Sequence, residues 1–177
     1  MTAPILSPRM ALIPMTPSFL RASLSGQIDE AERELGAALP GDWPNEALDV
    51  LGLRLQQLDA DPTLQPWLLR AIVLHATQVM IGHIGFHEAP GADRGGEFGF
   101  TVFPDYRRQG YAHEASLALM HWARESMGLT KFTLSISPEN APSQALAARL
   151  GFIRIGSQMD EIDGLEDVLE YRERPAR

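Results

Sequence analysis

The segment from Phe100 to Ala115, FTVFPDYRRQGYAHEA, has the residue types and spacing of a phosphate-binding turn. An apolar alternating run ends at a proline, a basic turn with Arg107, Arg108 and Gly110 follows, and a helical pattern begins at once. At a helix start, several backbone N–H groups lack intrahelical acceptors and the positive end of the helix dipole attracts anions. Gly110 and the small Ala112 leave room for a ligand to approach the backbone closely. The segment therefore predicts a site for a phosphate-bearing ligand.

Two histidines are candidates for proton transfer or metal binding. The alternation within residues 79–87 places His83 and His87 on one face of a strand, where they could act as a base or as a pair of metal ligands. No third ligand accompanies them in the sequence, so we expect no metal site. The alternative is that they form a pocket wall or lie at the surface.

Two other segments are candidates for substrate binding. Trp43 stands in a proline-bounded loop, LPGDWP, and could close over a substrate or cover the edge of the core. Asp160 and Glu161 belong to an acidic cluster beside a predicted turn, which could attract a cationic amine or be an ordinary solvated turn.

Length, composition and charge limit the class of protein to which this chain can belong. The chain has 177 residues, 45% hydrophobic and 21% charged, which is typical of a single globular domain over residues 1–177. The net charge of -8 disfavours nucleic acid as a partner. There is no cysteine, prolines interrupt the N-terminal segment where an export signal needs a continuous apolar run, and no stretch is apolar enough to span a membrane. We therefore expect a cytoplasmic protein.

The hydrophobic periodicity predicts a mixed α/β domain without repeats or linkers. Thr16 before a proline predicts a helix start, and Gly128 and Gly151 predict helix ends. The first expected helix opens at Pro17 and carries Phe19, Leu20 and Leu24. The others cover residues 27–35, 45–58, 109–127 and 141–150, with a leucine stripe formed by Leu48, Leu51, Leu55 and Leu58 in the third. The expected strands cover residues 10–13, 68–75, 79–87, 97–103, 131–137, 152–159 and 165–171.

Two motifs together resemble the GNAT superfamily of N-acetyltransferases. Arg107, Gly110 and Ala112 match its acetyl-CoA signature, R/Q-x-x-G-x-G/A, and residues 140–152, NAPSQALAARLGF, match its N-x-x-S…L-G-F helix. Within the superfamily, the segments GYAHEA, PENAPS and LPGDWP are most similar to the branch that includes the ribosomal-protein N-terminal acetyltransferases. The resemblance implies a mostly antiparallel sheet of about seven strands, flanked by helices, whose central strands splay apart.

The resemblance also implies how acetyl-CoA would bind. Pantetheine would lie between the strand with Val102 and the strand with Ser135, bonded to the backbone of residues 101–103, and an N–H near Val102 would support the thioester oxygen. The pyrophosphate would rest on the amides of residues 108–112. The implied cofactor-binding residues are Thr101, Val102, Phe103, Arg107, Arg108, Gln109, Gly110, Tyr111, Ala112, Asn140 and Ser143.

The implied reaction is acetyl transfer to a primary amine, on a protein N-terminus or a small molecule, by direct attack on the thioester. An amine of pKa near ~10 must lose a proton first, and Glu97, five residues before Val102, is the candidate base; a solvated glutamate is the alternative. Ala147 stands where many GNAT enzymes have a tyrosine that protonates the thiolate, so Ser143 or water would take that role.

We expect the acceptor between the LPGDWP loop and the acidic turn, with Trp43, His83, Asp160 and Glu161 as contacts. A homodimer stays open, and the alternative function is a catalytically weak acyl-CoA-binding or regulatory module on the same fold.

Overall fold

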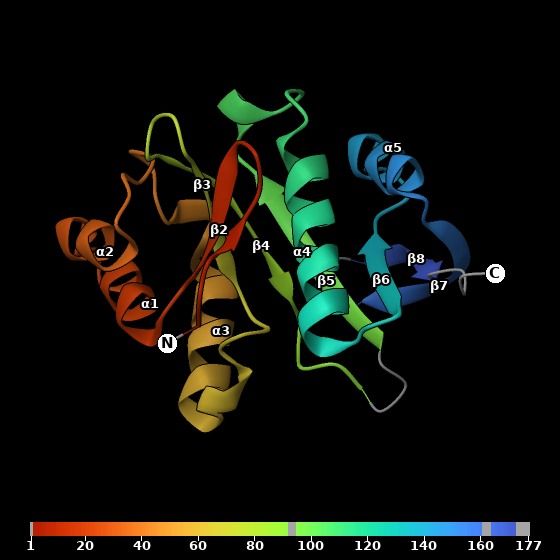
Figure 1. Ribbon diagram of the computed structural model, residues 1–177, viewed down its shortest axis with the longest axis horizontal. Coiled ribbons are helices and arrows are strands. Elements are labelled where there is room, and N and C mark those ends of the chain that lie inside the picture. Colours follow the sequence, from red (N-terminus) through yellow and green to blue (C-terminus); the bar gives the residue numbers. More distant parts are fainter. Residues whose placement is uncertain (1, 92–94, 161–163, 173–177) are drawn as a thin grey trace.

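A computed structural model describes residues 2–91, 95–160 and 164–172, and its centre is one eight-stranded sheet (Figure 1). The strand order is β1-β2-β3-β4-β5-β6-β8-β7, and every neighbouring pair is antiparallel except β5 and β6. The strands are β1 (Ile5–Leu6), β2 (Met10–Pro14), β3 (Arg70–Leu74), β4 (Met80–Phe86), β5 (Gly95–Val102), β6 (Lys131–Ile136), β7 (Ile153–Asp160) and β8 (Gly164–Arg172). The mixed, mostly antiparallel fold predicted from the sequence is confirmed.

The sheet has one strand more than the sequence predicted. The additional strand, β1, is only two residues long and pairs with β2 through Ile5 opposite Leu12. A run this short contains no measurable alternation, so periodicity could not reveal it.

The N-terminal helices cover one face of the sheet. They are α1 (Pro17–Leu24), α2 (Ile28–Leu35) and α3 (Leu48–Ala60), with short 3-10 turns at η1 (Asn45–Ala47) and η2 (Pro62–Leu64). As predicted, the Thr16 side chain caps α1, accepting a hydrogen bond of 3.2 Å from the amide of Phe19. The leucine stripe of α3 is only partly correct: Leu51 and Leu58 are buried, but Leu48 is exposed because the α-helix begins only there, after the tighter 3-10 turn.

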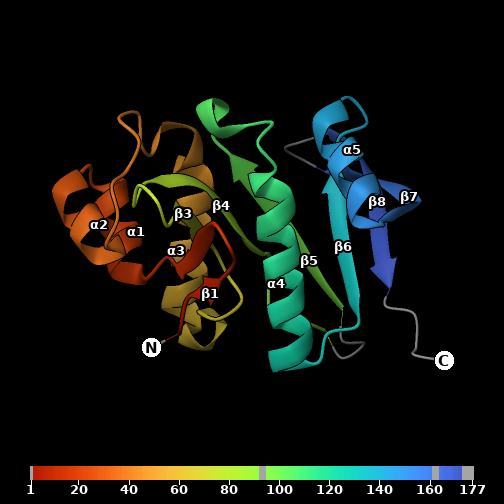
Figure 2. The ribbon, with the colours of Figure 1, turned by 45° about the horizontal axis from the view of Figure 1, so that its top comes forward.

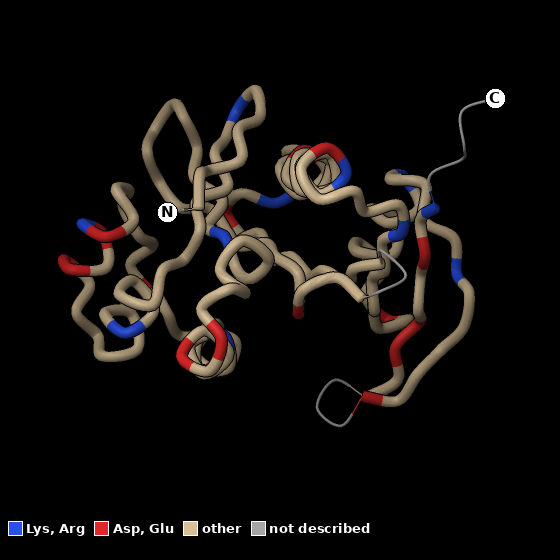
Figure 3. The backbone as a smooth tube through the Cα atoms, turned by 60° about the horizontal axis from the view of Figure 1, so that its bottom comes forward, with Lys and Arg blue, Asp and Glu red and all other residues tan. Residues whose placement is uncertain are grey.

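The other face of the sheet is covered by α4 (Tyr111–Met127), with α5 (Ala141–Leu150) beside it. In Figure 3, α4 lies on one side of the sheet, whereas α3 and the outer part of the β7–β8 hairpin lie on the other. Two buried clusters follow from this layering, one under α4 with Phe86, Phe98 and Phe132, and one under α1–α3 with Phe19 and Leu51. No helix in the described part of the chain is long and apolar enough to cross a bilayer.

The sheet opens between β5 and β6. These two parallel strands pair only from Gly95 opposite Lys131 to Glu97 opposite Thr133, and beyond that point β5 keeps only its other neighbour, β4. Figure 2 shows the two strands separating toward the end of the sheet where α4 begins and α5 lies. The predicted splay of the two central strands is confirmed.

Candidate functional site

The opening between β5 and β6 leads into a cavity of about 640 Å³. Three segments wall it: the end of β5, the turn that leads into α4, and one face of α5. The residues that line it are Phe100, Thr101, Val102, Tyr106, Arg107, Arg108, Gly110, Tyr111, Ala112, His113, Asn140, Pro142, Ser143, Ala145, Leu146 and Arg149. Two segments predicted to bind one ligand, about 30 residues apart in the sequence, therefore do wall one cavity.

The turn before α4 directs backbone amides at this cavity. Arg108 has a φ of 61° and Gly110 a φ of 79°, both in the left-handed region, so the chain reverses sharply before the helix. Gly110 is the N-cap of α4 and supplies no side chain to bond the first amides. The amides of Tyr111, Ala112 and His113 consequently have no acceptor within the helix. Together with the helix dipole, they make a binding site for an anion.

A pair of residues that the sequence did not suggest holds this turn in place. Arg9, just before β2, donates from Nη1 to the carbonyl of Gln109 at 3.0 Å and forms an ion pair of 2.6 Å with Glu114 in the first turn of α4. The Ser7 hydroxyl bonds the same carboxylate at 2.8 Å. Burial raises the pKa of Glu114, but the hydrogen bonds from Arg9 and Ser7 outweigh it and lower the pKa overall. Glu114 is therefore ionised and anchors Arg9 at neutral pH.

Arg107 lines this cavity and also bonds the end of β5, and its predicted phosphate contact stays a prediction. Its Nε donates a hydrogen bond of 2.8 Å to the carbonyl of Val102, so the side chain closes the end of β5. The carbonyl of Val102 must then point away from β4, toward the opening.

Backbone pairing shows which part of β5 a ligand can reach. The amide of Phe103 donates to Ile81 and the amide of His87 donates to Glu97, each at 2.9 Å, so residues 97 and 103 turn their backbone groups toward β4. Because antiparallel pairing alternates, Phe100 and Val102 present theirs to the opening. The prediction that residues 101–103 together bond pantetheine therefore fits only Val102. By the same alternation Thr101 turns its backbone groups toward β4, the amide of Phe103 is engaged, and the side chain of Phe103 faces the other side of β5.

On α5, the predicted residues reach the cavity in two ways. Asn140 caps the helix, its Oδ1 accepting a hydrogen bond of 3.2 Å from the amide of Ser143, and both residues line the cavity. Ala147 is fully buried and does not line it, so Ser143, one helical turn earlier, is the residue through which α5 places a hydroxyl on the cavity wall. Arg149, which the sequence reading did not single out, adds a positive charge to the same wall.

A second cavity, of about 590 Å³, lies on the side of β5 that faces α3 and the LPGDWP loop. Its walls include Trp43, Arg54, His83, His87 and Phe103. Phe100, Thr101 and Tyr106 line both cavities. The two spaces therefore meet at the end of β5.

Trp43 and His83 form the inner wall of this second cavity. Trp43 is buried, donates from its indole nitrogen to the Ser23 hydroxyl at 3.0 Å, and has its ring 6.2 Å from that of Phe103. Trp43 thus covers part of the core and also faces the cavity, and its contact with a substrate stays a prediction. Burial, together with the positive charge of Arg54, lowers the pKa of His83 to about 4. His83 is therefore a neutral group at neutral pH.

His87 directly follows β4, and its amide bonds the carbonyl of Glu97 in β5 beside the second cavity. His87 Nδ1 is 3.7 Å from Glu97 Oε1, and the side chain of His87 is the more exposed of the two. His87 Nε2 lies only 3.0 Å from the place where a Cβ on Gly99 would be, so the ring extends over β5 because residue 99 is a glycine. Burial lowers the pKa of His87, Glu97 opposes that shift, and Arg54 adds to it. His87 lines the cavity, whereas Glu97 stands behind it.

The structure does not bring Asp160, a predicted substrate contact, to this cavity. Asp160, at the end of β7, lines neither cavity, although the β7–β8 hairpin projects on the same side of the sheet as α3 (Figure 3). Glu161 lies outside the described residues. Within the ranges that the structure describes, no group of three or more acidic or histidine side chains gathers in a way that could hold a metal.

Comparison with known proteins agrees with this architecture. Residues 13–153 match the family described as the acetyltransferase (GNAT) domain. An uncharacterized N-acetyltransferase of Bacillus subtilis, YjdG, is 30% identical over 133 residues, which are 73% of this chain and 77% of that protein.

Two solved structures share the fold. An acetyltransferase from Agrobacterium tumefaciens has a TM-score of 0.66 at 24% identity, over 98% of this chain and 96% of that one. RimL, a ribosomal L7/L12 alpha-N-protein acetyltransferase solved with coenzyme A, has a TM-score of 0.67 at 18% identity, over 96% and 98%. With its family match, its splayed sheet and its uncapped helix start, this chain belongs to the GNAT family of acetyltransferases.

Proposed function

We propose that the protein transfers an acetyl group from acetyl-CoA to a primary amine by direct attack of the amine on the thioester. The observation that carries this proposal is the meeting of the two cavities at Phe100, Thr101 and Tyr106. One cavity has the walls of an anion site, and the other has titratable groups that can take a proton. Two reactants bound in these cavities would touch at the free edge of β5, which gives the proximity that a bimolecular transfer needs.

The first cavity fits a nucleotide thioester in size and in chemistry. The free amides at the start of α4 and the charges of Arg108 and Arg149 suit a pyrophosphate, and the opening beside Phe100 and Val102 suits an extended pantetheine arm. The bound coenzyme A in the RimL structure supports this assignment. When bound, acetyl-CoA supplies an activated acetyl group, and a backbone N–H of Val102 or Phe100 would stabilise the negative charge on its carbonyl oxygen.

The second cavity would receive the amine. An ammonium group of pKa near ~10 must lose a proton before it can react. We assign proton acceptance to His87 and Glu97 acting together: Nε2 of His87 faces the cavity, and Glu97 lies at Nδ1. The carboxylate would orient the ring and stabilise the imidazolium that forms. Catalytic hydrogen bonds are often long before substrates bind, so 3.7 Å is compatible with this role.

Ser143 is the proposed hydrogen-bond donor to the departing thiolate, since it is the hydroxyl that α5 places on the wall of the first cavity. A thiol of pKa near ~8.5 needs little help to leave near neutral pH. We therefore expect Ser143 to contribute less than the His87–Glu97 pair.

The test is a thiol-release assay with acetyl-CoA and a mixed panel of amino acids, peptides and polyamines, with products identified by mass spectrometry. We expect thiol release that depends on an amine and yields an acetylated amine. Binding of acetyl-CoA without thiol release from any amine would overturn the proposal in favour of an acyl-CoA-binding module.

A further inference from the structure

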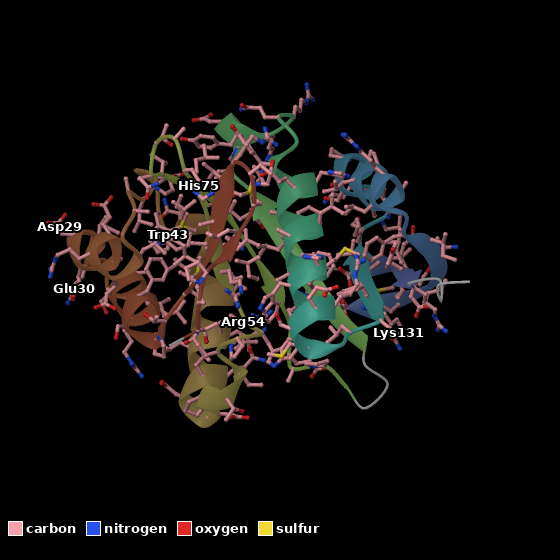
Figure 4. The ribbon with its side chains drawn as sticks, in the orientation of Figure 1. Asp29, Glu30, Trp43, Arg54, His75 and Lys131 are labelled. Atoms are coloured by element: carbon pink, nitrogen blue, oxygen red, sulfur yellow. The ribbon has the colours of Figure 1, made fainter. Side chains whose placement is uncertain are left out.

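Arg54 is a buried positive charge in the wall of the second cavity. It extends from α3, is only 7% exposed, and lines the cavity beside His87. Figure 4 shows Arg54 within the body of the molecule, in contrast to Asp29 and Glu30 at its outer edge. A charge held away from water is costly unless it is paired, so the partners of this guanidinium have to be accounted for.

The described protein groups satisfy Arg54 only in part. Nη1 donates to Gln57 Oε1 at 2.7 Å and to the carbonyl of His87 at 3.0 Å. Nε is buried without a hydrogen-bond partner, and no carboxylate among the described residues forms an ion pair with the side chain. Burial accordingly lowers the pKa of Arg54. Nη1 is bonded by two neutral groups, and among the described residues the charge has no counterion.

A second buried arginine, Arg70, shows how a guanidinium with a purely structural role is bonded in this protein. Arg70 is fully buried, lines neither cavity, bonds the carbonyls of Ala3, Leu12 and Pro66, and lies 4.9 Å from the ring centroid of Trp122. Its charge is therefore spread over three acceptors and an aromatic face. Nε is buried without a hydrogen-bond partner in both arginines, so that atom does not distinguish them. Arg54 differs from Arg70 because it has two acceptors instead of three and borders an open space.

The other described charged groups around the cavity do not neutralise the charge of Arg54. Burial, with Arg54 adding to it, lowers the pKa of both His83 and His87 and keeps them neutral at pH 7. At His87 the carboxylates of Glu97 and Glu88 oppose this shift without reversing it. Asp42, Glu46 and Asp105 line the same cavity but are exposed residues outside ion-pair distance of Arg54. The exposed residues of the cavity are thus negatively charged, whereas its buried wall carries the positive charge of Arg54. This polarity would admit a molecule with an ammonium group and hold its anionic group deeper.

We propose that the acetyl acceptor carries a carboxylate, and that Arg54 binds this carboxylate in the second cavity. The inference rests on the proposed amine acetylation and names its substrate class. It replaces the simple cationic acceptor expected from the acidic turn at Asp160.

The position of Arg54 limits how far the carboxylate lies from the reacting amine. Nη1 bonds the backbone of His87, and the His87 ring is the proposed proton acceptor. The carboxylate and the amine would therefore bind beside the same residue, as they do when both belong to one amino acid or to an acidic residue at a peptide N-terminus. A guanidinium pairs well with one carboxylate, and a cavity of about 590 Å³ has room for such a group.

The experiment compares matched acceptors in the thiol-release assay at pH 8, where both cavity histidines are neutral. One arm uses free α-amino acids and their amides; the other uses peptides with aspartate or asparagine at the N-terminus. We expect wild-type kcat/KM to favour the carboxylate of at least one pair by about tenfold or more. The arm that shows the preference identifies the source of the carboxylate.

Two variants separate binding from a structural role. Arg54→Gln should remove the preference by raising KM for the carboxylate acceptor, with little change for the amide. Gln57→Ala removes the neighbouring hydrogen bonds but keeps the charge, and should keep the preference. If Arg54→Gln fails to fold, Arg54→Met replaces it as the variant without the charge.

The outcomes are distinct. A wild-type enzyme that shows no preference for the carboxylate in either arm would overturn the inference and leave the proposed function standing. Equal loss for both acceptors in Arg54→Gln, in a folded protein, would also overturn it, because Arg54 would then be structural. Absence of thiol release with every amine would instead overturn the proposed function itself.

Discussion

Oε1 of Glu97 lies 3.7 Å from Nδ1 of His87, and a backbone hydrogen bond of 2.9 Å between the same two residues fixes their strands at that point. The pairing of β5 with β6 ends at Glu97, so this pair stands where the sheet opens. His87 extends over Gly99 toward the second cavity. The sequence suggested each residue separately as a base, and the structure makes them neighbours.

Glu97→Gln should lower kcat by about 100-fold while leaving the affinity for acetyl-CoA nearly unchanged. Glu97 opposes the lowering of the His87 pKa, so its removal lets that pKa fall further. The acidic limb of the kcat/KM profile should therefore move to lower pH in the variant. The measurement is a pH–rate profile of both proteins with one amine.

His87→Gln is the companion variant, and it should abolish the acidic limb. A limb that disappears in Glu97→Gln but persists in an active His87→Gln would show that Glu97 alone takes the proton.

Gly99→Ala should displace the His87 ring while leaving both ionisable groups, His87 and Glu97, in the sequence. A Cβ at this position would lie 3.0 Å from His87 Nε2, so the end of the ring must move. We expect kcat to fall about tenfold or more, since small displacements of a catalytic group are costly. Gly156→Ala in β7 is the control because its Cβ meets nothing within 4 Å. Equal kcat for the two variants would contradict the placement of His87.

Gly110→Leu should abolish the rise in melting temperature that acetyl-CoA causes in the wild-type protein. The leucine would crowd the amides of the phosphate turn and strain its φ of 79°. Gly26→Leu is a matched control, because Gly26 has a φ of 70°, open space around it and no place in the walls of either cavity. Both variants should lose stability, but only Gly110→Leu should lose the shift. A normal shift in Gly110→Leu would rule out this turn as the phosphate site.

Local signals account for the parts of the fold and site that the sequence predicted. Helix α5 has its capping asparagine, an early proline and a terminal glycine within twelve consecutive residues, and its predicted bounds are correct. The turn before α4 was also predicted from a short segment, residues 104–112. Arg9 and Glu114 are separated by 105 residues, so no local pattern links them.

Arg54 shows the same limit at the candidate site. It reads in the sequence as one charged residue on an amphipathic helix, and its importance comes from its place against β4. The role of Phe103 was also misassigned, because which strand face borders which cavity depends on the pairing register with β4. Strand register and long-range contacts, unlike helix capping, cannot be predicted from any short segment of the sequence.

His83 should make the protein less stable as the solution becomes acidic. The unfolded chain binds a proton at His83 below about pH 6.5, whereas the folded protein does so only below about 4, so the unfolded state holds more protons in between. Stability should therefore fall as the pH is lowered through this range, by up to about 3 kcal/mol from this group.

Urea unfolding of wild type and His83→Gln from pH 7 to pH 4 measures this contribution. The free energy of unfolding should fall more steeply for the wild type, whereas His75→Gln, at an exposed position, should follow the wild-type slope. Parallel slopes for wild type and His83→Gln would show that His83 is not held neutral by burial.

The central claim is that the two cavities hold both substrates at once and that the acetyl group passes directly between them at the end of β5. Initial rates measured over a grid of acetyl-CoA and amine concentrations test it most directly. We expect double-reciprocal plots with intersecting lines, as a ternary complex requires, and no acetylated protein when the enzyme is mixed with acetyl-CoA alone. Parallel lines together with an acetyl-enzyme detected by mass spectrometry would contradict the account.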